Sequence, residues 1–448
     1  MKTLFVSLGC DKNTVDTRKM AGILEDGGIC SFTEDEAAAE AAVVNTCAFI
    51  DSAKQESIDE ILSVAQLKKT GKLKYLIVTG CLAQRYQDEI LKLIPEVDAV
   101  LGTTAEDSIG EVLRKLSEGE KPEKAVIENP DLVPSAARQV LTFGSFVGYL
   151  KIAEGCNKCC TYCAIPSIRG HYRSVPMEQI LEDARGLAAQ GAKELILVAQ
   201  ETTLYGVDLY GKKMLPELLR RLCLVNGIRW IRVLYCYPER ITDKLLEVMA
   251  REEKLVKYLD IPIQHCNGDI LRRMNRQGDA DTLAALLNKI RQMIPDITLR
   301  TTLITGFPGE TEAQFTELAE FIQAQRFDRL GWFAYSQEEG TRAAEFPDQV
   351  PEDVRQHRAD ILMEQQQLIV EEKNNARLGQ VCTAVIEGYD RWAECWFGRT
   401  AADAPDIDGK VFIRSETPLH IGDYVTVRLD EVLDYDFVGE VVTDESAQ

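Results

Sequence analysis

Short apolar runs alternate with helix-prone segments along most of this 448-residue chain, and this alternation is the strongest constraint on its fold. Over residues 1–120, the runs KTLFVSLG, AAVVNT, LKYLIVTG and VDAVLG are each followed by a segment of helical character. The helices are expected over about 13–26, from Asp51 as N-cap, over 84–94 and over 106–116. Because alternating strands and helices build parallel sheets covered by helices, we predict an α/β domain with an open parallel sheet over 1–120.

The alternation resumes from about residue 145, where six further apolar runs are separated by helix-prone segments. These candidate strands are VGYLKIA, ELILVAQ, WIRVLYCY, YLDIPIQ, TLRTTLIT and RLGWFAYS. Six β/α units predict a barrel or partial barrel whose site lies at the carboxyl ends of its strands. We assign residues 145–350 to this (β/α)6 domain, the Pro- and charge-rich segment 121–144 to a linker, and the polar segment 351–378 to a helical connector.

Residues 379–448 contain short candidate strands separated by Gly- and Asp-rich turns, which predicts a small all-β barrel of the OB-like kind. From Gln380 to Gln448 there are 15 acidic and 5 basic residues, a net charge of −10. A barrel that grips RNA needs a positive groove, so this charge makes tRNA an unfavourable partner. We expect the acids, Asp403, Asp406 and Asp408 among them, to form a docking face for a basic protein; the alternative is a merely solvated acidic surface.

Composition and charge limit the partners and the cellular location that we expect for the protein. The net charge of −21 favours a basic partner or none. No run approaches about 18 apolar residues, and the N-terminal stretch MKTLFVSLGCDKN reaches charge too soon for a signal peptide, so we expect a cytoplasmic protein without a membrane partner. The 13 cysteines of such a chain argue for metal or redox chemistry rather than for disulfides.

Three cysteines directly follow the first three clear strands, in the sequences LGC, NTC and TGC. These are Cys10, Cys47 and Cys81, here called the strand-end triad. Ligands of open parallel sheets bind at the edge where the carboxyl ends of the strands meet. Three thiols that are distant in sequence would therefore meet in space and share a metal site; the alternative is that they are three buried structural cysteines.

Three further cysteines lie on one short loop, in EGCNKCCTYCAIP, just after the first strand of the central domain. These are Cys156, Cys160 and Cys163, here called the loop triad. Three thiolates can hold three irons of a 4Fe–4S cluster and leave the fourth iron open to a ligand. Zinc is the alternative, but zinc-binding CxxC pairs normally stand about a dozen residues apart, whereas these pairs abut. Cys159 leaves open a second cluster register, in which it replaces Cys160.

The spacing of the loop triad, three and then two residues, resembles that of the radical S-adenosylmethionine (SAM) superfamily. This likeness favours Cys160 over Cys159 as the ligand, and Tyr162, just before the last cysteine, fits the same pattern. SLGCDKNTVD, VVNTCAFI and VTGCLAQRY resemble the N-terminal motifs of the methylthiotransferases. GFPGET and a C-terminal barrel similar to the TRAM module complete that three-part architecture, so the resemblance covers nearly the whole chain.

The resemblance implies two 4Fe–4S clusters and SAM as cofactors. The loop triad would hold the radical cluster, whose open iron chelates SAM, and an electron from a reduced donor would split SAM to give a deoxyadenosyl radical. The strand-end triad would hold a second cluster, able to carry sulfur to the substrate; the alternative for it is an electron relay. Residues at or near strand ends are expected to contact SAM, although a simple βα turn is the alternative for several: Tyr162, Gln200, Glu201, Thr202, Gln264, Gly306, Pro308 and Gly309.

Two branches of the methylthiotransferases differ in substrate. One modifies adenosine in tRNA, and the other modifies an aspartate of ribosomal protein S-twelve. IPIQHCNGDILRRMNR, EEGTRAA and FGRTAADAPDIDG resemble the ribosomal-protein branch, and the acidic barrel agrees with a basic protein substrate. Asp11, Arg18 and Cys266 depart from the usual family residues beside these motifs. The alternatives are a tRNA adenosine methylthiotransferase and a non-catalytic iron–sulfur or zinc protein that binds RNA.

Overall fold

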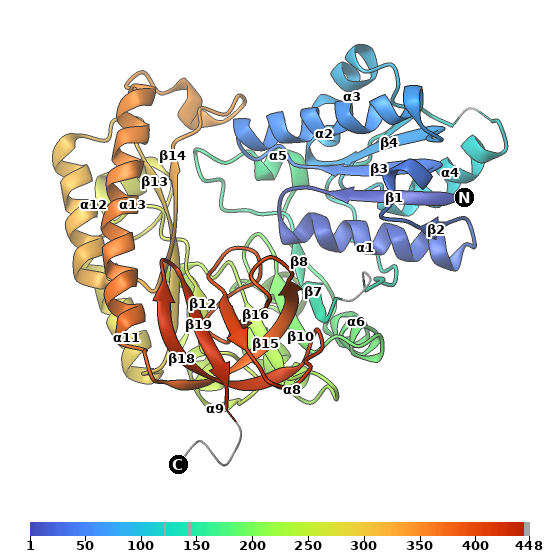
Figure 1. The fold of residues 1–448 in the computed structure, drawn as a ribbon. Coiled ribbons are helices and arrows are strands. Elements are labelled where there is room, and N and C mark those ends of the chain that lie inside the picture. The colour runs from blue at the N-terminus through green and yellow to red at the C-terminus, as the bar shows by residue number, and fades with distance from the viewer. Residues whose placement is uncertain (121, 142–144, 443–448) are drawn as a thin grey trace.

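The computed structural model describes residues 1–120, 122–141 and 145–442, which form an N-terminal sheet domain, a central β/α domain and a C-terminal barrel (Figure 1). The N-terminal sheet is parallel throughout, in the order β2-β1-β3-β4-β5-β6. Its strands are β1 (Lys2–Ser7), β2 (Ser31–Phe32), β3 (Ala41–Thr46), β4 (Tyr75–Gly80), β5 (Ala99–Leu101) and β6 (Ala125–Val126). Its helices are α1 (Asp11–Asp26), α2 (Asp51–Thr70), α3 (Cys81–Leu93) and α4 (Ile109–Ser117), with 3-10 turns η1 (Glu36–Ala38) and η2 (Glu106–Ser108).

This sheet follows from its apolar runs. All residues of β3 are buried, as expected for a parallel strand covered on both faces. The four predicted helices are present and begin within three residues of the predicted starts. Asp51 is the first helical residue of α2 rather than its cap, which is Ile50. β6 lies within the predicted linker 121–144, so part of that segment completes the sheet, while residues 121 and 142–144 lie outside the described residues.

The central domain consists of two parallel three-stranded sheets, β7-β10-β11 and β12-β13-β14, which coincide with the six predicted strands. The sheets meet where the Cys236 amide donates to the Asp260 carbonyl over 2.9 Å. The strands are β7 (Val147–Lys151), β10 (Glu194–Val198), β11 (Trp230–Val233), β12 (Tyr258–Asp260), β13 (Thr298–Thr305) and β14 (Arg329–Ala334), and a small antiparallel pair is formed by β8 (Ala153–Glu154) and β9 (Arg173–Ser174). The helices are α5 (Ile165–Arg169), α6 (Met177–Ala189), α7 (Val207–Tyr210), α8 (Leu215–Cys223), α9 (Asp243–Arg251), α10 (Gly268–Arg273), α11 (Ala280–Met293) and α12 (Glu312–Gln325), with 3-10 turns η3 (Pro238–Arg240) and η4 (Arg342–Glu345).

The predicted helical connector is α13 (Glu352–Asn375), which packs along β14 and α12 before the chain enters the barrel (Figure 1). Gln366 on its buried side donates to the carbonyl of Phe327 over 2.9 Å. The C-terminal domain is a closed barrel in the order β15-β16-β17-β19-β18, as predicted. Its strands are β15 (Val381–Asp390), β16 (Cys395–Thr400), β17 (Val411–Arg414), β18 (Tyr424–Leu433) and β19 (Asp436–Val441).

The C-terminal barrel packs against alternate residues of the central strands. Ile196 and Val198 of β10 share an apolar cluster with Val385 and Ala404 of the barrel, whereas the residues between them belong to the core under the helices. The ring of Trp230, the first residue of β11, also meets the Tyr424 ring edge-on at 4.8 Å. The barrel and the central domain therefore share a buried apolar core.

The acidic loop between β16 and β17 lies partly in this contact, which corrects the prediction that it forms an exposed docking face. Asp403 is buried and pairs with Arg329 of β14. The Asp408 side chain is also buried and accepts a 2.6 Å hydrogen bond from the Tyr258 hydroxyl. Asp406 is exposed. Two of the three acids are thus used inside the protein, because polar groups of the central strands need partners once they are buried.

The N-terminal domain contacts the central domain on two sides. On one side, Arg18 of α1 donates to the Val147 carbonyl of β7 over 2.9 Å. On the other side, the segment after β14 reaches α2 and α3: Glu338 pairs with Lys54 at 2.8 Å, and the Glu339 carbonyl accepts from Arg85 over 3.0 Å. These contacts hold the carboxyl edge of the N-terminal sheet against the loop triad's side of the central domain. Among the described residues, no helix is long and apolar enough to span a bilayer.

Candidate functional site

The strand-end triad lies where the sequence places it, at the carboxyl edge of the N-terminal sheet. Cys10 directly precedes α1, Cys47 follows β3, and Cys81 is the first residue of α3. Gly9, at φ +84°, lets the chain come close to Cys47: a Cβ on Gly9 would lie 2.8 Å from the Cys47 sulfur. The first two cysteines of the triad are therefore packed on neighbouring loops.

An asparagine fixes these two loops to each other. The Asn13 side-chain amide donates to the carbonyl of Leu8 over 2.8 Å and to the carbonyl of Thr46 over 3.0 Å. These carbonyls stand just before Cys10 and Cys47. Asn13 thus holds the two cysteine loops to each other through their backbone carbonyls.

The thiols of the strand-end triad are in a dry environment. Burial, together with the neighbouring thiols Cys81 and Cys10, raises the pKa of Cys47 to about 12. Burial also raises the pKa of Cys81, against the lowering effect of Arg169, whose Nε donates to the Cys81 sulfur over 3.4 Å. Metal binding at these thiols must therefore release protons, as is usual for thiolate ligands.

The loop triad is gathered beside the antiparallel pair β8–β9. The Cys156 amide donates to the Gly170 carbonyl over 3.0 Å, and the Cys163 amide donates to the Cys160 carbonyl over 3.0 Å. Burial, together with the neighbouring Cys160 thiol, raises the pKa of Cys156 to about 11. Cys156 and Cys160 are buried, whereas Cys159 is exposed with a left-handed backbone at φ 51°.

The chemistry of both donor sets fits iron–sulfur clusters. Each triad supplies three thiols from one place in the fold, with no disulfide among them. Within the described residues, no three His, Cys, Asp or Glu side chains are grouped so that they could hold one metal ion. A single zinc ion would need its thiols within about 4 Å of one another, because each Zn–S bond is about 2.3 Å long. A cubane instead places each thiolate on a different iron.

Two predicted SAM-contacting residues lie near the loop triad: Tyr162 offers an aromatic ring, and Gln200 offers a polar side chain. Burial raises the pKa of Tyr162, the neighbouring Cys160 thiol raises it as well, and the Tyr162 ring meets that of Phe307 edge-on at 6.5 Å. The Gln200 amide donates to Glu154 over 2.8 Å, while its carbonyl oxygen is buried and has no partner among the described residues. That oxygen is a free acceptor near the loop triad and suits a donor such as an amino group.

Glu201 and Thr202 follow Gln200 but differ from each other. Burial raises the pKa of the Glu201 carboxyl, and Arg240, at 2.8 Å, opposes this effect. The Thr202 hydroxyl is within hydrogen-bonding distance of the carbonyls of Leu234, at 2.8 Å, and Tyr235, at 3.1 Å. Thr202 thus joins the ends of β10 and β11, a structural role that its position in the sequence did not reveal.

Gln264, predicted to end the fourth strand, lies four residues beyond β12 in a left-handed conformation, at φ 71°, which a non-glycine residue adopts only at some cost. It pairs with Leu303 of β13 as an isolated parallel bridge. The neighbouring His265 is fully buried, and its Nδ1 accepts from the Asn267 amide over 2.9 Å. The histidine is thus part of the turn that starts α10, in agreement with a structural role.

The residues of the GFPGET motif lie at the end of β13. The Gly306 amide donates to Glu310 over 3.0 Å, and a Cβ on Gly306 would lie 2.1 Å from the Arg355 side chain. The Gly309 amide donates to the Asp348 carbonyl over 2.8 Å. Pro308 lies between them and is buried. Gly306 is thus required by close packing of the protein on itself, and both glycines adopt the left-handed backbone that favours glycine, at φ 66° and 82°, which is a second reason for their presence besides the predicted approach of SAM.

A cavity of about 290 Å³ opens beside the cysteine loop and contains residues that sequence reasoning did not single out. Its lining includes the basic residues Lys158, Arg240, Arg272 and Arg276 and the acidic residue Glu201. The positions of these basic residues in the sequence follow no recognisable spacing. Only the fold shows that they line one cavity. Three of these cations are paired with carboxylates, Lys158 with Glu239, Arg240 with Glu201 and Arg272 with Asp269, so the cavity beside the loop triad is polar and lined by ion pairs.

Family models match the chain in three parts. They are described as "Uncharacterized protein family UPF0004" at residues 2–102, "Radical SAM superfamily" at residues 150–322 and "TRAM domain" at residues 378–442. Among solved structures, a radical SAM methyltransferase, TsrM from Kitasatospora setae, is 15% identical with a TM-score of 0.56, covering 74% of this chain and 72% of that chain. That likeness shows a shared fold. The superfamily match also implies a 4Fe–4S cluster and SAM as cofactors.

Curated relatives match the chain along almost its whole length. "Ribosomal protein uS12 methylthiotransferase RimO" of Lachnoclostridium phytofermentans is 52% identical, covering 98% of this chain and 99% of the relative. The protein of the same name from Acetivibrio thermocellus is 46% identical, covering 99% of each chain. The two cysteine triads, the three-part fold and this identity agree, and the chain belongs to the RimO family of radical SAM methylthiotransferases.

Proposed function

We propose that this enzyme inserts a methylthio group at the β-carbon of an aspartate in ribosomal protein uS12, and that it does so in the cytoplasm. The observation that carries the proposal is the 52% identity, over nearly the full length, to a protein named for this activity. The acidic C-terminal barrel supports it, because ribosomal proteins are basic.

The enzyme would hold two 4Fe–4S clusters, one on each cysteine triad, and would take electrons from a reduced donor. The exposure of Cys159, against the burial of Cys156 and Cys160, supports the register with Cys160 as ligand. When bound, a cluster with an open iron supplies the electron and the coordination site that allow SAM to be cleaved to a radical. The strand-end triad would hold the cluster that serves sulfur transfer.

The chain's own residues bind, orient and shield these groups. Tyr162 lies beside the Cys160 thiol and, together with Phe307, would line that side of the loop with aromatic rings. Gln200 would present its free carbonyl oxygen to the amino group of SAM. The polar cavity beside the loop would receive charged groups of SAM, since side chains of both signs converge there. Gly306, Pro308, Gly309 and Gln264 would shape the SAM pocket through their turns.

We propose that the outer surface of the barrel recognises uS12. Trp392, at the turn between β15 and β16, is 98% exposed, and the neighbouring rings of Tyr389 and Trp396 meet at 5.1 Å. Exposed aromatics surrounded by acids suit a Lys- and Arg-rich partner, through long-range attraction and cation–π contact. The exposed acids of this barrel include Glu394, Glu416, Asp430, Glu431, Asp434 and Glu440.

The direct test is mass spectrometry of two candidate substrates. The holoenzyme would be incubated with SAM, a reductant and a sulfide source, together with either uS12 or unmodified tRNA. We expect uS12 to gain the mass of a methylthio group in place of hydrogen on one aspartate, and tRNA to be unchanged. Modification of tRNA adenosine with no change in uS12 would contradict the proposal in favour of the tRNA branch.

A further inference from the structure

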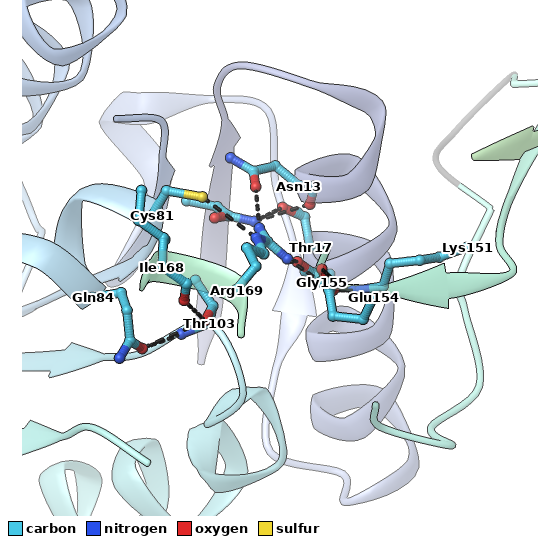
Figure 2. Close-up of polar contacts among 12 residues, drawn as sticks. Asn13, Thr17, Cys81, Gln84, Thr103, Lys151, Glu154, Gly155, Ile168 and Arg169 are labelled. Carbon is cyan, nitrogen blue, oxygen red and sulfur yellow. Dashed lines mark hydrogen bonds and ion pairs between the residues drawn. The ribbon is translucent and has the colours of Figure 1, made fainter. Parts of the chain in front are cut away.

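One buried guanidinium group contacts the surroundings of both cysteine triads (Figure 2). Arg169 is the last residue of α5 and follows the loop triad closely in sequence. Its side chain is only 2% exposed. Its Nε donates to the sulfur of Cys81, a member of the strand-end triad, over 3.4 Å. A residue of the central domain thus bonds directly to a proposed cluster ligand of the N-terminal domain.

The same guanidinium also reaches the other two strand-end cysteines through Asn13. Its Nη2 donates to the Asn13 side-chain oxygen over 2.6 Å. The Asn13 amide group holds the carbonyls of Leu8 and Thr46, which stand just before Cys10 and Cys47. The orientation of Asn13, and hence of the two loops, is therefore set in part by Arg169.

On its other side, Arg169 bonds to the start of the loop that carries the loop triad. Its Nη1 donates to Glu154 over 3.0 Å and to Asp16 of α1 over 2.8 Å. Glu154 stands two residues before Cys156 and accepts from Gln200 over 2.8 Å. One planar group thus connects α1 and the strand-end triad to the residue that leads into the loop triad; Figure 2 shows Arg169 between Cys81, Asn13 and Glu154.

A purely structural interdomain ion pair is the simpler explanation and must be weighed. Lys151 also pairs with both Asp16 and Glu154. The two cations Lys151 and Arg169 thus balance the two carboxylates Asp16 and Glu154 through the ion pairs alone. The contact of Arg169 with Cys81 is therefore not needed for charge balance inside the protein. It directs a charged donor at a sulfur, and donors to cluster sulfurs are a recognised way in which proteins adjust reduction potential.

We propose that Arg169 is a positioning residue that sets the Cys81 ligand, raises the reduction potential of the cluster on the strand-end triad and ties that cluster site to the loop triad. The proposal rests on the proposed second cluster. Arg169 is chosen over Lys151 because an ammonium group cannot supply the planar fork that meets a sulfur, an amide and two carboxylates at once.

The test compares Arg169→Lys with a matched control in the full-length, reconstituted protein. The control is Arg399→Lys, because Arg399 is equally buried and bridges Glu194 and Glu387 at the barrel interface. The measurements are iron and sulfide content, thermal unfolding, and potentiometric titration followed by electron paramagnetic resonance. Titrating a variant that lacks the loop-triad thiols as well identifies the signal of the strand-end cluster.

We expect Arg169→Lys to shift the midpoint potential of the strand-end cluster to more negative values and Arg399→Lys to leave it unchanged. A positioning role would also be supported if Arg169→Lys lost only the strand-end cluster while its melting temperature matched that of Arg399→Lys. An unchanged potential with full cluster content would overturn the inference, as would equal loss of both clusters and of stability in the two variants. A wild-type chain that assembles only one cluster would instead contradict the proposed function.

Discussion

The two cysteine triads reach similar thiol groupings by opposite routes. The loop triad lies within eight consecutive residues, between the short strands β8 and β9, so its geometry is largely a local property of one loop. The strand-end triad is collected from three strand ends spread over 72 consecutive residues, so it exists only when the N-terminal sheet has formed. A local motif can be recognised by spacing, whereas a motif assembled by topology requires a prediction of strand order.

The surroundings of the triads differ as well. The loop triad has Tyr162 and Arg276 beside it and an open cavity at its side. The strand-end triad is enclosed by Asn13 and Arg169, with the thiols of Cys47 and Cys81 buried. The first arrangement suits a site that must admit SAM, and the second suits a site held rigidly near it. The predictions below separate the two roles.

The largest effect is expected from the loop triad. Cys160→Ala should reduce deoxyadenosine formation from SAM to background, because the proposed radical cluster loses a ligand. Cys159→Ala should keep most of that activity, since Cys159 is exposed. The assay is chromatography of deoxyadenosine after reduction with dithionite. An inactive Cys159→Ala protein together with an active Cys160→Ala protein would show that the register is the other one.

The strand-end triad should affect the product but not the cleavage of SAM. Cys10→Ala, Cys47→Ala or Cys81→Ala should abolish methylthio transfer to uS12 while deoxyadenosine is still formed, because the two triads belong to different domains. Both products would be quantified in one reaction by mass spectrometry. If a folded variant with an intact radical cluster no longer cleaved SAM, the proposed division of roles would be wrong.

Exposed barrel acids should matter less than either triad. Reversing Asp430, Glu431 and Asp434 to Lys should weaken uS12 binding by about tenfold at low salt, because the attraction between opposite charges is lost. Calorimetry or interferometry with the full-length enzyme would measure this. The matched control reverses three exposed acids on the helical side of the central domain, Asp281, Asp296 and Glu320. Equal weakening by both triple variants would argue against a docking surface on the barrel.

The smallest effect concerns the barrel interface at low pH. Burial alone would raise the pKa of Glu194, but the guanidinium groups of Arg399 and Arg232 outweigh it and hold that pKa below its usual value. A depressed carboxyl pKa stabilises the fold above the unfolded pKa of about 4, and this contribution is lost as pH falls through the lower folded value. The melting temperature of the wild type should therefore fall as the pH drops below about 4. In Glu194→Gln it should fall less steeply over the same pH range. Parallel melting curves for the two proteins would contradict this role of Glu194.

Sequence reasoning predicted the parts of the site that follow from pattern and topology. The six cysteines were predicted as cluster ligands because spacing identifies one triad and strand ends identify the other, and their role as ligands stays a prediction. It missed Arg169 and the cavity arginines, because a long cationic side chain is usually exposed and nothing in its spacing shows that it is buried. It also assigned Asp403 and Asp408 to an outer surface, although tertiary packing pairs them with the central strands. Charge counts over a domain do not distinguish buried acids from exposed ones.

The measurement that tests the central claim most directly is the iron and sulfide content of the reconstituted protein and of two triple variants. With one 4Fe–4S cluster on each triad, the wild type should bind about eight irons per chain, and a variant lacking either triad should bind about four. Mössbauer spectra of the two variants should then each show one cubane. About four irons in the wild type, or zinc in place of iron, would contradict the account of two clusters on two triads.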